Sequence, residues 1–226
     1  MNADAAKLTR DKILDAAADV FGREGYKTAT VRKICRQAGT NVASVNYYFG
    51  GKAGLYREVA RNLIAETFDR FPVVAPNASE LSHEQRLQFF VKGILNRLLS
   101  PDGLSGYPGK GQLVARELAE PSEILDNIVE EFVRPTAVAL SRIVRGLLGP
   151  KAADTEVMKC QVSIIGQCFH YALARPIVTR LFSVDPSQPP IVEELADHVT
   201  RFSIAGLAGI RAQIEQRRHK PPVDRG

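Results

Sequence analysis

The segment from residue 30 to residue 56 constrains the fold most strongly, and it reads TVRKICRQAGTNVASVNYYFGGKAGLY. Two short runs with helical apolar spacing flank a turn at Gly39 and Thr40. Glycine permits the sharp backbone turn that joins the two helices of a helix-turn-helix unit. The second run ends in three aromatic residues, and Lys52 follows. The pattern predicts a helix that enters the DNA major groove and is anchored to the flanking phosphates.

The charge distribution agrees with a polyanionic partner for this part of the chain. The formal net charge is +5 for the 226 residues. Residues 1–70 hold 12 Lys and Arg against 8 Asp and Glu, a difference of +4, whereas residues 71–226 hold 18 against 17. The basic excess therefore lies in the amino-terminal part, where nucleic acid would bind.

Apolar residues recur at three- and four-residue spacing along almost the whole chain, which predicts an all-α protein. In the first part we expect helices over residues 10–24, 30–38, 42–48 and 52–71, with Gly25 ending the first and Thr30 capping the second. Pro72 and Pro76 mark a boundary. The expected architecture is an amino-terminal three-helix helix-turn-helix domain, residues 1–56, and a carboxy-terminal helical bundle, residues 57–220, used for ligand binding and dimerisation. Helix 52–71 links the two.

In the second part the same spacing predicts helices over residues 82–99, 112–118, 122–148, 154–174 and 190–216, with a Gly- and Pro-rich loop at 100–111. Pro135 falls inside one of these helices, so we expect a kink or break there. Arg175, Pro176 and a short apolar turn should separate the last two helices.

The exposed side of helix 42–48 and the turn before it carry small, polar or aromatic side chains that suit base edges and phosphates. They are Thr40, Asn41, Ala43, Ser44, Asn46 and Tyr47. Tyr48, Lys52 and the first amides of the next helix would form a phosphate clamp. The alternative for residues 10–70 is a small basic helical bundle without a DNA role.

Residues 10–56 resemble the amino-terminal domain of TetR-family repressors in three features: the AADVFGREGY entry, the TVRKICRQAG turn and the YYFGGKAGL segment. The resemblance implies that Thr30 caps the second helix and that Thr30, Tyr48 and Lys52 contact phosphates. It implies that Thr40, Ala43, Ser44, Asn46 and Tyr47 face the groove. Asn46 and the Gly50-Gly51 pair depart from the usual family pattern.

Side-chain chemistry refines these roles. Asn46 can pair bidentately with adenine, and the methyl groups of Ala43 or Val45 can pack on thymine, although Val45 equally fits the core. Arg10, Tyr48 and Lys52 would supply salt-dependent affinity that is blind to sequence. Arg32 and Lys33 either add to that affinity or are solvated charges. Cys35 is expected to be a core residue.

Two further stretches, VARELAEPSEILDNIVEEFVRP and QCFHYALARP, resemble the carboxy-terminal domain of the CecR branch of the TetR family. This resemblance implies a repressor whose bundle binds a small effector. Candidate effector contacts are polar or aromatic residues on apolar helices: Arg116, Glu117, Gln167, Phe169, His170 and Tyr171. A hydrogen-bonded core histidine is the favoured alternative for His170, and an ion pair is an alternative for Arg116 with Glu117.

The last two helices are the expected homodimer surface, because apolar stripes and two glycines allow close helix approach. The residues assigned to it are Ile164, Cys168, Leu195, Val199, Phe202, Gly206 and Ile210. The same stripes also fit an intramolecular core. A two-fold dimer would present its two reading helices to successive major grooves of a palindromic operator, about 34–36 Å apart.

The remaining composition predicts a cytoplasmic protein without cofactor or metal. Three cysteines form no CxxC pair, four histidines have no metal-ligand spacing, and no apolar run approaches the length of a membrane span. The leading hypothesis is a ligand-responsive DNA-binding repressor. Control by a protein partner or by cysteine oxidation is an alternative. A helical-bundle enzyme is a further one, for which the sequence shows no nucleophile with a base, metal cluster or phosphate loop.

Two substitutions separate base reading from phosphate binding. Asn46→Ala is expected to relax base choice, because it removes the side chain that pairs with adenine. Lys52→Ala is expected to weaken binding to all duplexes and to lower the salt slope by about one, because it removes one phosphate contact. Selection of bound duplexes from a random pool, with affinity measured against salt, tests both. Unchanged affinity and preference in both variants would show that this helix does not read DNA.

Overall fold

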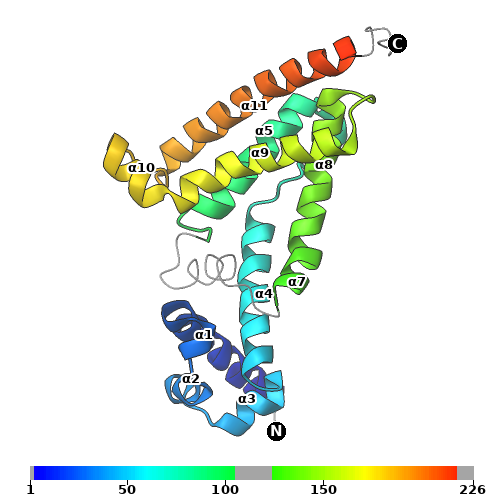
Figure 1. Ribbon diagram of the computed structural model, residues 1–226. Helices are drawn as coiled ribbons and strands as arrows, with labels where there is room; N and C mark the ends of the chain where they lie inside the picture. Colours follow the sequence, from blue (N-terminus) through cyan, green and yellow to red (C-terminus); the bar gives the residue numbers. More distant parts are fainter. Residues whose placement is uncertain (1–2, 105–123, 218–226) are drawn as a thin grey trace, which may run out of the picture. The chain divides into compact units, whose positions relative to one another are not determined.

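The computed structural model describes residues 3–104 and 124–217. All regular secondary structure in these two ranges is helical (Figure 1), which confirms the all-α prediction. None of the described helices is both long and apolar enough to cross a membrane. The chain forms two compact units: unit 1 consists of Met1–Arg70 and Pro101–Phe132, and unit 2 of Phe71–Ser100 and Val133–Gly226. Helix 52–71, expected as a link after a division at residue 56, thus lies in unit 1 up to Arg70.

Unit 1 is built on four helices that share one core. They are α1 (Ala3–Thr28), α2 (Val31–Ala38), α3 (Val42–Phe49) and α4 (Lys52–Arg70). Phe21 of α1, Ile34 of α2 and Leu55 of α4 are fully buried, and Val45 brings α3 into the same cluster. Each buried side chain removes apolar surface from water, so the short helices α2 and α3 are stabilised mainly by packing.

The first helix begins earlier than expected, at Ala3, and its α-helical backbone is interrupted at Gly25. Gly25 has a φ of 76° and a ψ of 169°, a conformation that glycine adopts without the steric cost of a side chain. The predicted stop at Gly25 is confirmed. The turn places Tyr26 against Phe21 and Tyr56, with ring centroids 6.3 and 4.8 Å away.

The second segment of unit 1 contains the short helix α7 (Leu125–Ile128), followed by a π-helical turn, η2 (Val129–Val133). Two contacts hold this segment against α4. Arg61 forms a 2.7 Å ion pair with Glu131, and the rings of Phe68 and Phe132 meet edge to face at 5.3 Å.

The π-helical turn is explained by the proline ring of Pro135. Pro135 has no amide hydrogen, so it cannot bond to the carbonyl of Glu131 four residues earlier, and its ring crowds that carbonyl. The backbone widens into a π turn before it resumes as α8 (Arg134–Leu148), with the proline in its first turn. The kink or break expected at Pro135 takes the form of this π-helical turn, and the backbone stays helical through Val133.

Unit 2 contains the short 3₁₀ helix η1 (Ala78–Glu80), then α5 (His83–Leu99), α8, α9 (Asp154–Leu173), α10 (Arg175–Phe182) and α11 (Pro189–Arg217). Ser82 caps α5 by accepting from the Gln85 amide, and the Gln85 side-chain oxygen accepts from the Ser82 amide in return. The central helix is α5, which packs against α8, α9 and α11. Its apolar stripe is buried at Leu87, Phe90 and Leu95, as the periodicity predicted.

Residues 175–182 were expected to form a turn, and that prediction is wrong. They form the helix α10, because a proline in the first helical turn needs no amide partner and has a φ suited to a helix. The connection to α11 is closed by a bidentate ion pair between Arg175 and Asp185, with N–O distances of 2.9 and 3.0 Å. Asp185 also accepts hydrogen bonds from the amide and hydroxyl of Ser187.

The Arg175–Asp185 pair predicts a specific acid sensitivity. The Arg175 guanidinium, together with the Ser187 amide, lowers the pKa of Asp185 from 3.8 to about 2. A carboxylate whose folded pKa is depressed adds stability above its unfolded pKa, and that stability is lost as pH falls through the folded value. Asp185→Asn is therefore expected to destabilise the protein by about 1 kcal/mol at neutral pH, the upper end for an exposed ion pair.

The difference between the two proteins should vanish as the pH falls toward 2. Urea midpoints across this pH range measure it. Asp154→Asn is the matched control, because the Asp154 side chain is 91% exposed in its pair with Arg145. An Asp185→Asn difference that stays constant with pH would show that the carboxylate charge is not the cause.

Candidate nucleic-acid interface

The turn between α2 and α3 is defined by caps on both sides. Gly39 adopts a left-handed conformation, with a φ of 64° and a ψ of 37°, and ends α2. The amide of Thr40 donates to the carbonyl of Cys35 at 2.9 Å. Asn41 then caps α3, since its side-chain oxygen accepts from the amide of Ser44 at 3.0 Å. Residues 39–41 thus join the two helices in a short turn with a cap on each side, which is the helix-turn-helix connection that the sequence predicted.

The two faces of α3 are clearly separated. Val45 is fully buried, so the core alternative is correct for this residue and a contact with thymine is excluded. Ala43, Asn46 and Tyr47 are exposed, and Tyr47 retains 76% of its surface. These are the groups that the sequence assigned to base reading, and none of them is needed for the core.

The polar residues around the turn are partly engaged within the unit. Thr40 and Ser44 are half-exposed, and the Ser44 hydroxyl donates to the Asn41 side chain at 3.1 Å. Thr30 caps α2 as predicted, accepting from the Lys33 amide at 3.3 Å, while remaining exposed. Tyr48 is half-exposed and meets Tyr47 edge to face at 4.9 Å. Exposure on one side leaves these side chains accessible to a phosphate, and their DNA roles stay predictions.

The two cations assigned to phosphates both have partners inside unit 1. Lys52 Nζ lies 3.3 Å from the carbonyl oxygen of Lys27 and 4.7 Å from the centre of the Tyr26 ring. Arg10 forms a 2.5 Å ion pair with Glu58 and lies over the ring of Phe49 at 5.5 Å.

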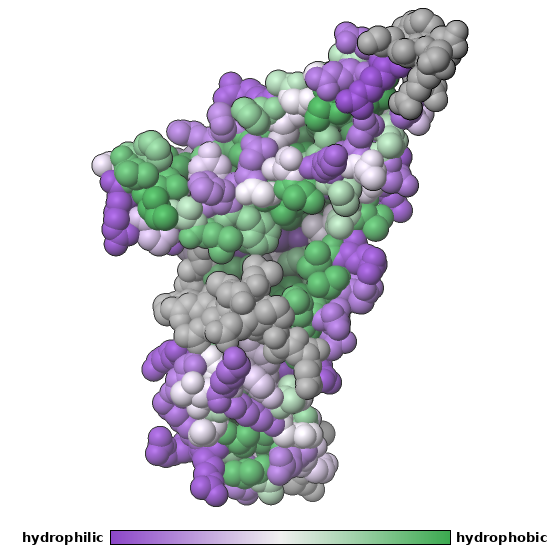
Figure 2. Space-filling model, viewed as in Figure 1, coloured by the Kyte–Doolittle hydropathy of each residue, from purple (hydrophilic) through white to green (hydrophobic). Residues whose placement is uncertain are grey.

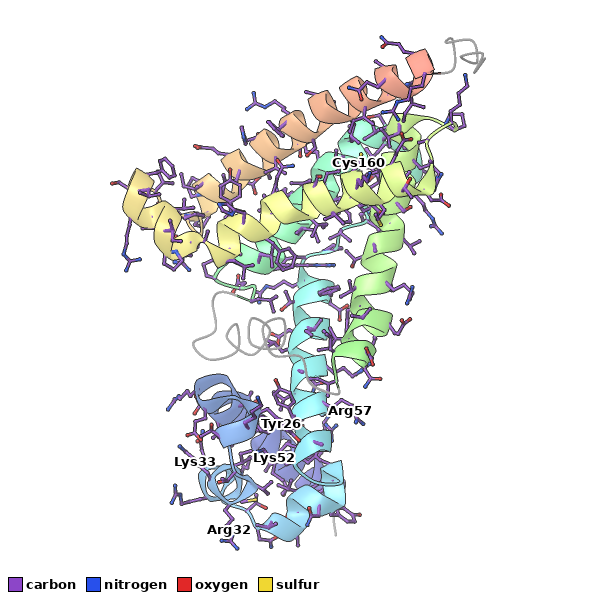
Figure 3. The ribbon with its side chains drawn as sticks, in the orientation of Figure 1. Tyr26, Arg32, Lys33, Lys52, Arg57 and Cys160 are labelled. Carbon is purple, nitrogen blue, oxygen red and sulfur yellow. The ribbon has the colours of Figure 1, made fainter. Side chains whose placement is uncertain are left out.

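The basic residues of α2 divide into two kinds. Lys33 is paired with Glu24 of α1, so its charge is partly neutralised. Arg32 and Arg36 are exposed, one turn apart on α2, and no described residue forms an ion pair with either. Figure 3 shows Arg32 on the outer side of α2, beside Lys33. Arg36 has the exposure and charge of a phosphate contact, although the sequence reasoning did not select it.

A groove between α1 and α4 has the opposite charge. Its polar rim is formed by Asp11, Asp15, Asn62 and Glu66, and its floor is apolar. Carboxylates repel DNA phosphates, so this face of unit 1 does not suit the duplex. The side of α2 and α3 remains the candidate reading surface.

The effector candidates lie in several environments. Arg116 and Glu117 lie outside the described residues. Gln167 faces the core of unit 2 and donates to the buried Ser203 at 3.5 Å, and Tyr171 packs on the same core one turn later. Phe169 is half-buried. His170 is exposed, so the interpretation of it as a buried, hydrogen-bonded histidine is wrong.

One buried cation in unit 2 was missed by sequence reasoning. Arg97 of α5 is 5% exposed, and its Nε donates to the carbonyl of Phe71 at 2.8 Å. A second donor lies 3.5 Å from the hydroxyl of Thr136. Burial lowers the pKa of Arg97 to about 10, which still leaves it charged at neutral pH. Its position in the apolar stripe gave no separate signal, because arginines at such positions usually extend to solvent.

The residues assigned to the dimer surface differ in their exposure: some are buried, some half-buried and some exposed. Ile164, Cys168 and Val199 are covered by the core of their own unit, so their assignment to an exposed surface is corrected. Leu195 and Ile210 are half-buried against the same core. Gly206 is exposed, and Phe202 is 63% exposed.

Other apolar side chains face solvent instead. On α9, Met158, Val162 and Leu173 are 53 to 66% exposed. Figure 2 shows hydrophobic residues gathered over α10, where Leu181 and Phe182 are 70 and 68% exposed. A continuous apolar periodicity did not distinguish these side chains from the buried ones on the same helices.

Two family models match the chain. Residues 13–59 match the model for bacterial regulatory proteins of the tetR family, and residues 83–207 match the carboxy-terminal domain of the HTH-type transcriptional dual regulator CecR. The CecR protein of Shigella flexneri is 25% identical over 177 residues, which are 75% of this chain and 78% of that protein. The probable HTH-type transcriptional regulator YttP of Bacillus subtilis is 33% identical over 88 residues, 39% of this chain and 42% of YttP.

Solved structures share the fold at low sequence identity. The transcriptional regulator FadR from Bacillus subtilis, determined in complex with stearoyl-CoA, aligns with a TM-score of 0.63 at 17% identity and covers 87% of this chain and 98% of its own. The hemolysin II transcriptional regulator HlyIIR aligns with a TM-score of 0.56 at 20% identity and covers 86% and 98%.

The left-handed turn predicts a purely conformational cost for a side chain at residue 39. A Cβ atom built on Gly39 meets no atom within 4 Å, so Gly39→Ala introduces no clash. It should still destabilise unit 1 by about 1–2 kcal/mol, the cost of a left-handed backbone for an L-residue. Gly39→Asn should cost less, because asparagine tolerates this conformation. Urea unfolding measures both, and equal stability of the alanine variant and the wild type would contradict the geometry.

Proposed function

Because this chain belongs to the TetR family of bacterial regulatory proteins and carries a CecR-type carboxy-terminal domain, we propose that it is a homodimeric, ligand-responsive transcriptional repressor. That it is a DNA-binding transcriptional regulator follows from the family. The capped helix α3 is the main support for the proposed reading mechanism. It buries Val45 and leaves Asn46 and Tyr47 exposed near the solvent-exposed side of α2.

In this proposal the exposed side chains of α3 specify bases and the surrounding groups fix the register. Asn46 pairs with adenine through its amide, and the Ala43 methyl packs on thymine. Tyr47 and Tyr48 extend over the backbone, and Thr30 donates to a phosphate through its hydroxyl, as Ser44 does once its hydroxyl turns from the Asn41 side chain. Arg32 and Arg36 add charge that does not depend on sequence.

The effector is proposed to bind in unit 2, where a short polar row faces the core of α9 and α11. Gln167 donates to Ser203, and Thr200 lies one turn before Ser203. The Thr200 hydroxyl is buried, and no described residue forms a hydrogen bond with it. Buried polar groups rarely stay unpaired, so this row is a suitable place for the polar part of a small ligand.

Regulation would follow from differential affinity. A small molecule that binds one conformation of unit 2 more tightly shifts the population toward it. Couplings of this kind typically change affinity by about 5–150-fold, and DNA weakens the effector by the same factor. The relative from Shigella flexneri is described as a dual regulator, so activation at some sites is the second candidate function.

Control by cysteine oxidation is less well supported. Cys35, Cys160 and Cys168 are all buried. Burial raises the pKa of the Cys168 thiol to about 12 and raises the pKa of the other two as well. A thiol reacts as its thiolate, so these three residues would react slowly with peroxide.

Selection of duplexes from a random pool tests the proposal directly. The wild-type protein should enrich an inverted repeat whose half-sites are centred about 10 base pairs, or a multiple of that, apart. Phe202→Glu should shift the protein from dimer to monomer in sedimentation, because it places a charge on the exposed apolar part of α11. Binding to the repeat should then weaken about a hundredfold or more, through the loss of the second half-site.

Gln216→Glu is the matched control, since it adds the same charge at an exposed position near the end of α11. Absence of any enriched duplex would refute DNA reading. Enrichment of single half-sites by a monomeric wild type would refute the dimer while leaving the reading helix in place.

A further inference from the structure

Helix α10 carries an apolar surface that the described part of its own unit does not cover. None of the residues of α10 is buried. The side chains of Ile177, Leu181 and Phe182 are 60, 70 and 68% exposed, and Leu173, at the end of α9, is 64% exposed. We call these four residues the α10 patch. A helix of two turns has little stability of its own, so a patch of this kind marks a contact with another surface.

A second exposed apolar surface lies nearer the other end of α9. Met158 and Val162 are 53 and 66% exposed. Because an α-helix turns about 100° per residue, residues 158, 162 and 173 project from the same side of α9. Leu173 lies about 22 Å further along that side than Met158, at a rise of about 1.5 Å per residue. Figure 1 shows α10 at the end of α9 opposite to the connection with α8. One side of α9 thus carries apolar surface toward both of its ends.

The middle of this side of α9 is open. Gly166 projects from the same side, about midway between Met158 and Leu173. It is exposed, and a Cβ atom built on it meets no atom within 4 Å. A residue without a side chain lets another backbone approach closely. A second helix can therefore cross α9 at this point.

A second copy of this chain is the occupant that fits both surfaces. A two-fold axis through the middle of α9 would pair this helix with its equivalent in antiparallel orientation, and each contact would occur twice. The end of one α9 would then meet the start of the other. The α10 patch would cover Met158 and Val162 of the partner subunit. A different protein would need two matching surfaces at the same spacing, whereas a second copy provides them by symmetry.

The area that a dimer requires supports the same occupant. A specific interface buries about 800 Å² on each partner, and its centre is apolar. In α11, Phe202 is the one large apolar side chain that is highly exposed among the described residues. The exposed side chains of α9 and the α10 patch add six more. Because α10 connects α9 to α11, its contact would be continuous with the dimer surface proposed above.

We propose that α10 is a dimerisation arm: the α10 patch of each copy packs on Met158 and Val162 of the partner subunit, and the two α9 helices cross at Gly166. This inference rests on the homodimer proposed above and identifies a contact that stabilises it. The Arg175–Asp185 ion pair, which closes the connection to α11, holds the base of the arm.

A charge on the arm tests its contact. Leu181→Glu should raise the dimer dissociation constant about a hundredfold or more, because the charge disrupts an apolar contact at two symmetric positions. Sedimentation measures the constant. Gln188→Glu is the matched control, since it adds the same charge at an exposed polar position after α10, and it should leave the dimer unchanged. Circular dichroism should show equal helix content in both variants, because Leu181 is 70% exposed in the single chain.

The opposite charge on α9 tests which surface the arm meets. Met158→Lys alone should weaken the dimer. In the Leu181→Glu background it should instead recover part of the lost affinity, because opposite charges then face each other between the two copies.

Cross-linking locates the two ends directly. The native cysteines Cys35, Cys160 and Cys168 are buried, so a short bis-maleimide should join introduced cysteines selectively. The double variant with Met158→Cys and Leu181→Cys should give a covalent dimer on a denaturing gel. Each single variant should stay monomeric there, because its introduced thiol faces an unmodified side chain.

A covalent dimer from Leu181→Cys alone would show that α10 meets α10, and it would overturn the inference. A dimer that Leu181→Glu leaves intact would overturn it as well. In both cases the wild type is still a dimer, so the proposed function stands. A wild type that sediments as a monomer while bound to its operator would refute the proposed homodimer itself.

Discussion

The candidate reading surface of this protein depends on one constraint, the left-handed backbone at Gly39. That conformation reverses the chain within three residues, so that Val45 of α3 and Ile34 of α2 enter the same core. Because an α-helix repeats every 3.6 residues, burying Val45 turns Asn46 and Tyr47 toward solvent. The core packing of a two-turn helix therefore determines which of its side chains face solvent. Helices this short have little stability of their own, and unit 1 supplies it through burial.

The positive side chains of unit 1 fall into two groups, those paired within the unit and those exposed to solvent. Arg10, Lys33 and Lys52 have internal partners on α1 or α4. Arg32 and Arg36 stand on the exposed side of α2. The acidic groove between α1 and α4 lies on another face of the unit. A count of positive residues in the sequence does not reveal this arrangement, because a formal charge is the same whether the side chain is paired or exposed.

Unit 2 shows how a helix can be apolar on two sides. On α9, Ile164 and Cys168 enter the core, while Val162 and Leu173 remain exposed. Periodicity predicted the helix and its apolar character correctly. It could not assign each apolar residue to core or to surface, because that depends on which neighbouring helices cover it. The same ambiguity explains why three residues expected on a dimer surface are buried within their own chain.

The sequence by itself determined the helical class, the helix-turn-helix connection, the stop at Gly25, the cap at Thr30 and an irregularity of the helix at Pro135. All of these depend on interactions between residues a few positions apart: backbone sterics of glycine and proline, side-chain caps and apolar spacing. Only the tertiary structure decided that Val45 is core, that His170 is exposed and that Lys52 lies on Tyr26. Those outcomes depend on residues brought together from distant parts of the chain, and local propensity carries no information about such partners.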